Sequence, residues 1–204
     1  MKRQTVRLKT ASVILALGML LTACGPKPVT LGRYRAVADF QLTDRTGRPV
    51  NRKDLEGRIV VVDFFFASCA EQCLVLGQRM AEVHRLLGGA DDVRLLSLTV
   101  DPRSDTPQAL ARYAPRFTDD TNRWWFVTGD KPALYDLIQQ SFLLPAGERE
   151  DERANFSNGF IHSDKIALVD AHGVVRAYFD GLAGNTPQRI VEAIDKLRHE
   201  PQPN

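Results

Sequence analysis

Two cysteines, Cys69 and Cys73, are the residues of this chain best suited to chemistry. They follow an apolar run at residues 59–66 and precede an amphipathic stretch, so the sequence places them where a buried strand ends and a helix begins. The partial positive charge of a helix N-terminus favours thiolate at such a place. A pair of thiols there either cycles through a disulfide or holds a soft metal ion, and the residue pattern alone leaves both chemistries open.

The spacing of the two cysteines constrains both chemistries. Residues at i and i+4 of an ideal helix have Cβ atoms about 5–6 Å apart, whereas a disulfide needs about 3.8 Å. A disulfide therefore requires Cys69 to lie off the helix, in the preceding loop. A metal ion tolerates a wider separation, because metal–sulfur bonds are about 2.3 Å long. Thiolates select Cu(I), and an added imidazole keeps Cu(II) accessible.

The N-terminus predicts export and a lipid anchor. Four basic residues within residues 1–9 precede an apolar run at residues 11–21. That run is shorter than the ~20 apolar residues that span a bilayer, and its length suits the core of a signal peptide. The sequence Leu21-Thr22-Ala23-Cys24 resembles the lipobox of bacterial lipoproteins. The resemblance implies cleavage after Ala23 and lipid attachment at Cys24.

Cleavage at this position changes the charge balance. The whole chain carries 27 Lys and Arg against 25 Asp and Glu, and residues 1–23 hold four of the basic residues and no acidic one. The mature chain therefore has a net charge of −2, and we expect no nucleic acid to bind. We expect a signal peptide at residues 1–23, a lipidated tether at 24–36 and one domain at 37–200. The protein would be a membrane-anchored lipoprotein that faces the periplasm or the cell exterior.

Apolar periodicity predicts an α/β fold. The alternation of strands and helices favours parallel pairing of the middle strands, and a late hairpin adds antiparallel ones. We therefore expect a thioredoxin-like fold, with a central mixed sheet flanked by helices, an N-terminal β-hairpin and a late β-hairpin. Trp124 and Trp125 are neighbours on a predicted strand, so one should be buried, and the other is a docking candidate if exposed. The predicted strands and hairpins are residues 39–50, 59–66, 93–100, 124–127 and 166–179, and the predicted helices are 74–87, 106 onward, 132–142 and 186 onward.

Three stretches together resemble the Sco (SenC) family of copper chaperones for cytochrome c oxidase. They are residues 65–73 with the two cysteines, residues 97–107 with an Asp-Pro-x-x-Asp-Thr-Pro pattern, and residues 161–173 with a His-Ser pair. The resemblance covers roughly residues 36–199, nearly the whole mature chain. It implies that copper, as Cu(I) or Cu(II), is bound by Cys69, Cys73 and His162.

The chain also departs from the family pattern. The family usually has proline after each cysteine, whereas Ala70 and Leu74 occupy these positions here. Loss of proline loosens φ at both positions, so metal affinity or partner choice can differ from that of typical members. Glu71 stands where the family usually has an aspartate between the cysteines.

Two acidic residues are candidates for supporting roles. Glu71 is expected to be exposed, where its charge would raise the pKa of a neighbouring thiol or steer copper toward the site. Asp101 belongs to a segment of Asp, Ser, Thr and Pro that also reads as a turn and helix cap. Its alternative role is to contact the residues that hold the thiols, without binding the metal itself, or to dock a partner.

Two functions remain open from the sequence. The first is an extracytoplasmic copper chaperone, whose recipient by resemblance is the dinuclear copper centre of cytochrome c oxidase subunit II. The second is a thioredoxin-type thiol–disulfide oxidoreductase, in which Cys69 attacks, Cys73 resolves, and the substrate is the cysteines of a recipient protein. His162 distinguishes them, because disulfide exchange needs no distant histidine and three-coordinate copper does.

Overall fold

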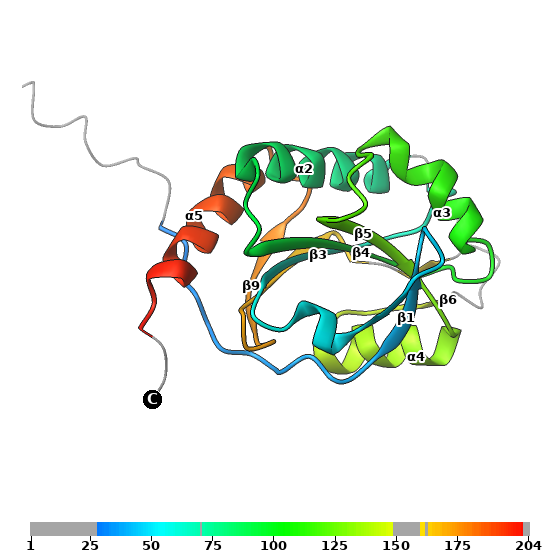
Figure 1. Cartoon of the computed structure of the whole chain (residues 1–204), viewed down its shortest axis with the longest axis horizontal. Coiled ribbons are helices and arrows are strands. Elements are labelled where there is room, and N and C mark those ends of the chain that lie inside the picture. Colours follow the sequence, from blue (N-terminus) through cyan, green and yellow to red (C-terminus); the bar gives the residue numbers. More distant parts are fainter. Residues whose placement is uncertain (1–27, 70, 149–159, 162, 202–204) are drawn as a thin grey trace, which may run out of the picture.

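The computed structural model describes residues 28–69, 71–148, 160–161 and 163–201 (Figure 1). Cys24, Ala70 and His162 therefore lie outside the described residues. The described chain forms a seven-stranded mixed sheet in the order β2-β1-β5-β4-β3-β8-β9, with helices on both faces. This confirms the predicted fold class. A separate two-stranded pair joins β6 (Gly147–Glu148) to β7 (Phe160–Ile161).

The sheet has a parallel centre and antiparallel edges, as the alternation of elements predicts. The central strands β3, β4 and β5 are parallel, the hairpin β1–β2 joins β5 antiparallel, and β8 pairs antiparallel with β3. The late hairpin is β8–β9. The strands are β1 (Gln41–Asp44), β2 (Pro49–Asn51), β3 (Ile59–Phe65), β4 (Val93–Thr99), β5 (Trp124–Thr128), β8 (Lys165–Val169) and β9 (Val175–Asp180).

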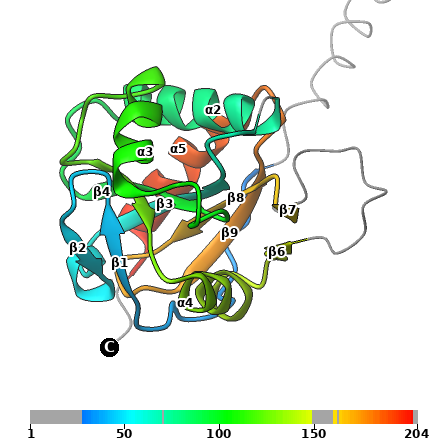
Figure 2. The same ribbon diagram turned by 90° about the vertical axis from the view of Figure 1, so that its right-hand side faces the viewer.

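Helices cover the two faces of the sheet unequally. Figure 2 shows α2, α3 and α5 on one face and α4 on the other. Local chemistry sets two of the ends: the Thr106 side chain caps α3 by accepting from Ala109 N at 3.3 Å, and α2 stops at Gly88, whose φ is 55°. The helices are α2 (Gln72–Leu87), α3 (Pro107–Tyr113), α4 (Lys131–Asp136), which continues as a π-helical segment (Leu137–Ser141), and α5 (Thr186–His199), with short 3-10 turns at Arg52–Leu55 and Ala114–Arg116.

Strand β3 is buried along its whole length, and its side chains alternate between the two faces. Phe64 packs edge-on against Phe142 on the α4 side, with ring centroids 5.3 Å apart. Phe65 stacks on Tyr113 of α3 on the other side, with centroids 5.1 Å apart. Asp63 has the same parity as Phe65, so it also faces the layer of α2 and α3. The thiol segment begins where this strand ends.

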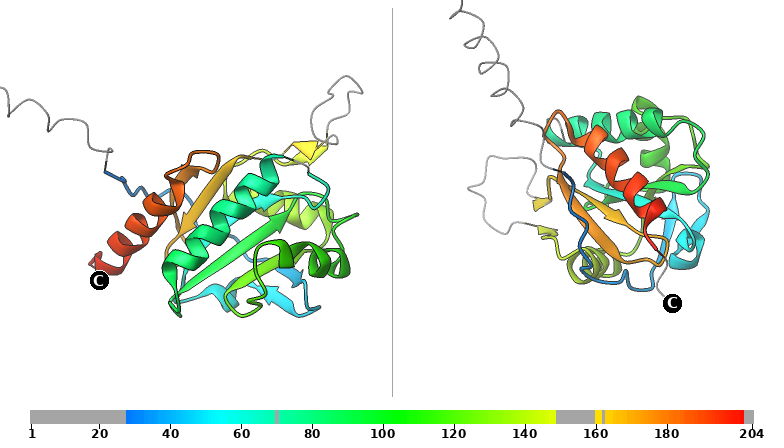
Figure 3. Two further views of the ribbon diagram at one scale, coloured as in Figure 1. Left: turned by 90° about the horizontal axis from the view of Figure 1, so that it is seen from above. Right: turned by 90° about the vertical axis from the view of Figure 1, so that its left-hand side faces the viewer.

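Part of the predicted tether is packed against the domain. Gly32 N and Tyr34 N donate to the carbonyls of Arg176 and Val175 at 2.8 and 2.9 Å, so this segment runs beside β9 (Figure 3). Val29 is buried, and its backbone N–H donates to Glu192 of α5. Composition predicts a lipidated tether at residues 24–36, and the hydrogen bonds to β9 and α5 attach its described residues to the folded domain. None of the described helices combines the length and the apolar character needed to cross a membrane.

The two tryptophans do not divide between core and solvent. Trp124 is 0 % exposed and Trp125 is 5 % exposed, so Trp125 is not an exposed docking residue. The guanidinium groups of Arg48 and Arg94 lie over the Trp125 ring, 4.5 and 5.8 Å from its centroid. These arginines cover the face of the ring that strand alternation alone would leave open.

Candidate functional site

The two thiols lie side by side at the junction of β3 and α2. Cys69 sits in the loop, where its backbone N–H donates to Phe66 O at 3.1 Å, and Cys73 is in the first turn of α2. The backbone N–H of Cys73 donates to Cys69 Sγ at 3.4 Å. Both residues are buried, and no disulfide joins them. Because Cys69 is off the helix, as a disulfide would require, both chemistries predicted for the pair remain available to it.

The electrostatics of the pair differ from the expectation for a helix N-terminus. A hydrogen bond with Cys69 and burial both raise the pKa of Cys73 far above its ordinary value. Proximity to Cys69 and Asp63 raises it further. The helix N-terminus predicts thiolate at this position, but burial and neighbouring groups of the same charge outweigh that effect. Cys73 is therefore held as a protonated thiol, which must lose its proton before it can attack a disulfide or bind a metal ion.

The side chain of Asp63 is a buried carboxyl group close to the Cys73 thiol. It accepts a hydrogen bond from Ser97 Oγ at 2.5 Å, and Ser97 accepts one from Trp124 Nε1 at 2.9 Å. Burial raises the pKa of Asp63 to about 7, and the Ser97 hydrogen bond opposes that rise. Sequence reasoning did not assign this residue a role. The available signal was a single acidic residue inside the apolar run 59–66.

Asp105 anchors the loop that carries Cys69. Its carboxylate accepts from Ala67 N at 3.1 Å and from Thr99 Oγ1 at 2.5 Å. It is 2 % exposed, and burial raises its pKa. Asp105 therefore ties the end of β4 to the backbone two residues before Cys69. The sequence analysis proposed a supporting role for Asp101, the other aspartate of the motif, and the contact of Asp105 with the thiol loop adds a second residue to it.

Asp101 and Glu71 have more local positions. Asp101 is 5 % exposed, and it shapes its own turn by accepting from Ser104 N at 3.3 Å and from Asp105 N at 2.9 Å. Its burial leaves it no surface for docking a partner in this structure. Glu71 is exposed, as predicted, and its side chain makes no capping hydrogen bond to α2. An effect of Glu71 on the thiols or on copper remains a prediction.

His162 lies outside the described residues, but its neighbours in the chain do not. The pairing of Val62 with Ala167 brings the start of β8 to the end of β3 where the thiol loop leaves. The carbonyl of Asp164 accepts from Gly181 N at 2.8 Å. A Cβ atom added at Gly181 would overlap Leu76 Cδ2, so this corner also touches α2 one turn after Cys73. Within the described residues alone, no group of three or more His, Cys, Asp or Glu side chains is placed to hold a metal ion.

Gly181 is needed for this close approach, and its replacement is a test of it. An alanine Cβ would lie 2.7 Å from Asp164 O, which is backbone and cannot move aside cheaply. We expect Gly181→Ala to lower the free energy of unfolding by about 1–3 kcal/mol, the usual cost of overpacking. Urea denaturation measures this cost. Gly184→Ala is the matched control, because nothing lies within 4 Å of a Cβ added there. Equal stabilities for the two variants would contradict the described corner.

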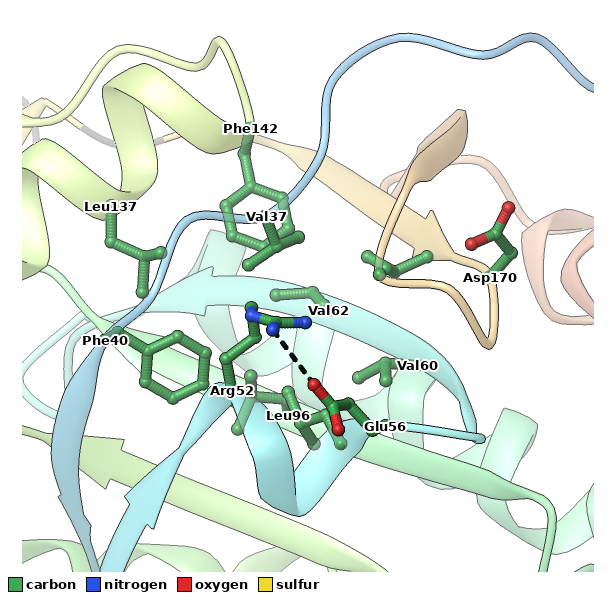
Figure 4. Close-up of a pocket in the computed structure, with 13 residues that line it drawn as sticks. Val37, Phe40, Arg52, Glu56, Val60, Val62, Leu96, Leu137, Phe142 and Asp170 are labelled. Atoms are coloured by element: carbon green, nitrogen blue, oxygen red, sulfur yellow. Dashed lines mark ion pairs between the residues drawn. The ribbon is translucent and has the colours of Figure 1, made fainter.

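An apolar pocket on the opposite face of the sheet is not the functional site. Figure 4 shows it between α4 and the sheet, with Val60, Val62 and Phe142 in its wall and the Arg52–Glu56 ion pair at its edge. It has about 20 Å³ of free volume, room for one water molecule. No cysteine lines it. The reactive groups of the described chain are therefore those at the β3–α2 junction.

The fold and the site together define a class: a thioredoxin-like α/β protein with two vicinal thiols where the first long strand meets its helix. The sequence profile of the SCO1/SenC family matches residues 29–199. The chain is 27% identical over 173 residues to the SCO1 protein homolog of Bacillus subtilis (strain 168). The aligned region covers 83% of this chain and 86% of that protein. The chain belongs to the SCO1/SenC family.

Solved structures agree with this assignment. A SCO1/SenC family lipoprotein from Bacillus anthracis str. Ames superposes with a TM-score of 0.73 at 27% identity, covering 86% of this chain and 100% of that one. ScoI of Bradyrhizobium japonicum, solved with copper bound, gives a TM-score of 0.66 at 26% identity, covering 81% and 99%. The thioredoxin-like architecture predicted from the sequence is thereby confirmed.

Proposed function

We propose that this protein binds copper outside the cytoplasm through Cys69, Cys73 and His162. The proposed recipient is the dinuclear copper centre of cytochrome c oxidase subunit II. The observation that carries the proposal is the pair of reduced, adjacent thiols at the junction of β3 and α2. Its support from relatives is the copper-bound structure of a member of the same family. Two thiolates and an imidazole form a soft, three-coordinate site that a partner's ligand can enter.

The chain's connectivity supports His162 as the third ligand. Lys165, the first residue of β8, is three residues after His162, and three residues span at most about 10 Å. The start of β8 and the adjoining Asp164 lie at the corner formed by the end of β3 and the first turns of α2. We therefore propose that the imidazole of His162 approaches both sulfurs. No other histidine is attached to this corner by so short a segment.

Because the pKa of Cys73 is raised, copper can bind only if this thiol loses its proton. Copper binding must displace the Cys73 proton, so binding releases a proton and weakens as the pH falls. Delivery runs in the opposite direction, because the departing copper leaves a Cys73 thiolate that takes up its proton again. We further propose that Cys24 carries the lipid anchor, that Glu71 acts in copper capture or docking, and that the buried Asp101 supports the thiol site from within the fold.

The second candidate is a thiol–disulfide oxidoreductase acting on the cysteines of a recipient. The contact that favours it is the 3.4 Å separation of Cys73 N and Cys69 Sγ, which places the two side chains next to each other. In that case Cys69 attacks and Cys73 resolves. The two functions are compatible, because the recipient's cysteines must be reduced before they can accept copper.

A copper titration of the detergent-solubilised full chain separates these functions. The carrier predicts stoichiometric copper with sulfur-to-copper charge-transfer bands, both lost in Cys69→Ser and in Cys73→Ser. The oxidoreductase predicts reduction of insulin disulfides that depends on the same cysteines. Wild-type protein that reduces insulin but binds no copper would replace the first proposal with the second.

A further inference from the structure

Tyr113, the last residue of α3, belongs to an aromatic cluster directly behind the thiol segment. Its ring stacks on Phe65, with an interplanar angle of 14°, and meets Phe117 edge-on at 5.4 Å between centroids. Phe65 ends β3 and precedes the thiol loop by a few residues. The ring of Tyr113 is thus fixed on the face of the sheet that also carries Asp63.

The face of helix α2 that carries Cys73 packs against the same aromatic cluster. A Cβ atom added at Gly77 would lie 2.5 Å from the Phe117 ring, so only glycine permits the observed packing. Gly77 is four residues after Cys73 and therefore shares its helix face. The thiol of Cys73 and the ring of Tyr113 are brought to one interface by two independent contacts, one through β3 and one through α2.

The Tyr113 hydroxyl group has no hydrogen-bond partner in the part of the chain that the structure describes. The residue is 5 % exposed, so its hydroxyl group is shielded from bulk solvent. Burial raises the pKa of this hydroxyl, and the proximity of Cys73, Asp63 and Cys69 acts in the same direction. A buried donor without an acceptor destabilises the folded chain. A phenylalanine would fill the same space without that cost.

We propose that the Tyr113 hydroxyl donates a hydrogen bond to the Cys73 sulfur once that sulfur is a copper-bound thiolate. This rests on the proposed function. A thiolate is a far better acceptor than the neutral thiol of the copper-free protein, in which Cys73 is already engaged with Cys69. The hydrogen bond withdraws electron density from sulfur, so it favours Cu(I) over Cu(II). Tyr113 is then a positioning and tuning residue that acts through Cys73.

The test compares Tyr113→Phe with wild type in the full-length protein, with and without copper. Without copper, the variant should unfold at a higher temperature, because an unsatisfied buried hydroxyl is gone. With copper, it should bind Cu(I) about tenfold more weakly, and its sulfur-to-Cu(II) charge-transfer band should move to lower energy. Opposite effects on the two forms are not expected of a residue that only fills space.

Tyr178→Phe is the matched control. Its hydroxyl already donates to Phe142 O at 2.7 Å, on the other face of the sheet. This variant should lose stability without copper and leave the charge-transfer band in place. Tyr113→Phe protein with the wild-type band and Cu(I) affinity would overturn the inference while leaving the carrier function intact. Wild-type protein that binds no copper would overturn both.

Discussion

Asp63→Asn is expected to gain stability relative to wild type as the pH rises, by about 3 kcal/mol between about pH 5 and about pH 8. Burial raises the pKa of Asp63 from 3.8 to about 7, so the folded protein holds this proton more tightly than the unfolded chain does. The contribution of Asp63 to stability is therefore fully present in acid and is lost as the pH rises toward 7. Asparagine cannot ionise and keeps an oxygen that accepts from Ser97 Oγ.

The measurement is the free energy of unfolding by urea at several pH values. Other titrating groups are common to both proteins, so they cancel in the difference. Asp195→Asn, at an exposed position on α5, gives the effect of the same substitution outside the core. A difference between Asp63→Asn and wild type that stays constant over this pH range would show that Asp63 is not the buried titrating group described.

Asp105→Ala is the second substitution that we expect to change the free energy of unfolding strongly. The change removes the acceptor for two donors, Ala67 N and Thr99 Oγ1, close to the thiol loop. Each buried donor left without a partner costs about 1–3 kcal/mol, so we expect a loss of about 3 kcal/mol in the free energy of unfolding. The loop before Cys69 also loses its anchor, so copper affinity should fall as well.

Asp105→Asn is the informative comparison for this prediction. Its side-chain oxygen retains one acceptor, so its stability should lie between those of wild type and Asp105→Ala. Thermal and urea unfolding measure both variants. A stability of Asp105→Ala within about 1 kcal/mol of wild type would show that the loop is held by other contacts.

Local sequence patterns predicted the architecture well, because each pattern reflects a local physical cause. The run at residues 59–66, apolar except for Asp63, marks a strand buried on both faces, and it forms β3 at the centre of the sheet. Gly88 ends α2 through its positive φ and the Thr106 side chain caps α3, in agreement with the predicted helices at 74–87 and from 106 onward. The two hairpins were readable from turn residues between apolar runs.

Features that depend on tertiary packing were not predictable in this way. Gly32 and Tyr34 pair with Arg176 and Val175 of β9, which lie 144 and 141 positions later in the chain. The composition of the segment does not indicate this pairing. The same is true of the arginines that cover Trp125. The raised pKa of Cys73 follows from burial and from its neighbours in space, whereas the sequence shows only the favourable helix end.

The site was predictable in its reactive pair and not in its surroundings. Cys69 and Cys73 follow from spacing, and the structure brings them together. Choosing between Asp101 and Asp105 required knowing which carboxylate faces Ala67 N, and a turn motif does not specify this. Tyr113 reads as an apolar-face residue of a helix, and only its unpartnered hydroxyl sets it apart.

X-ray absorption spectroscopy of the copper-loaded full chain tests the central claim most directly, because it identifies the atoms bound to the metal. The account predicts two sulfur ligands and one imidazole nitrogen in wild type. In His162→Ala the imidazole should disappear and copper affinity should fall. His172→Ala, in the β8–β9 turn at the far end of β8, should match wild type. Copper bound by His162→Ala with the wild-type spectrum and affinity would contradict the three-ligand carrier.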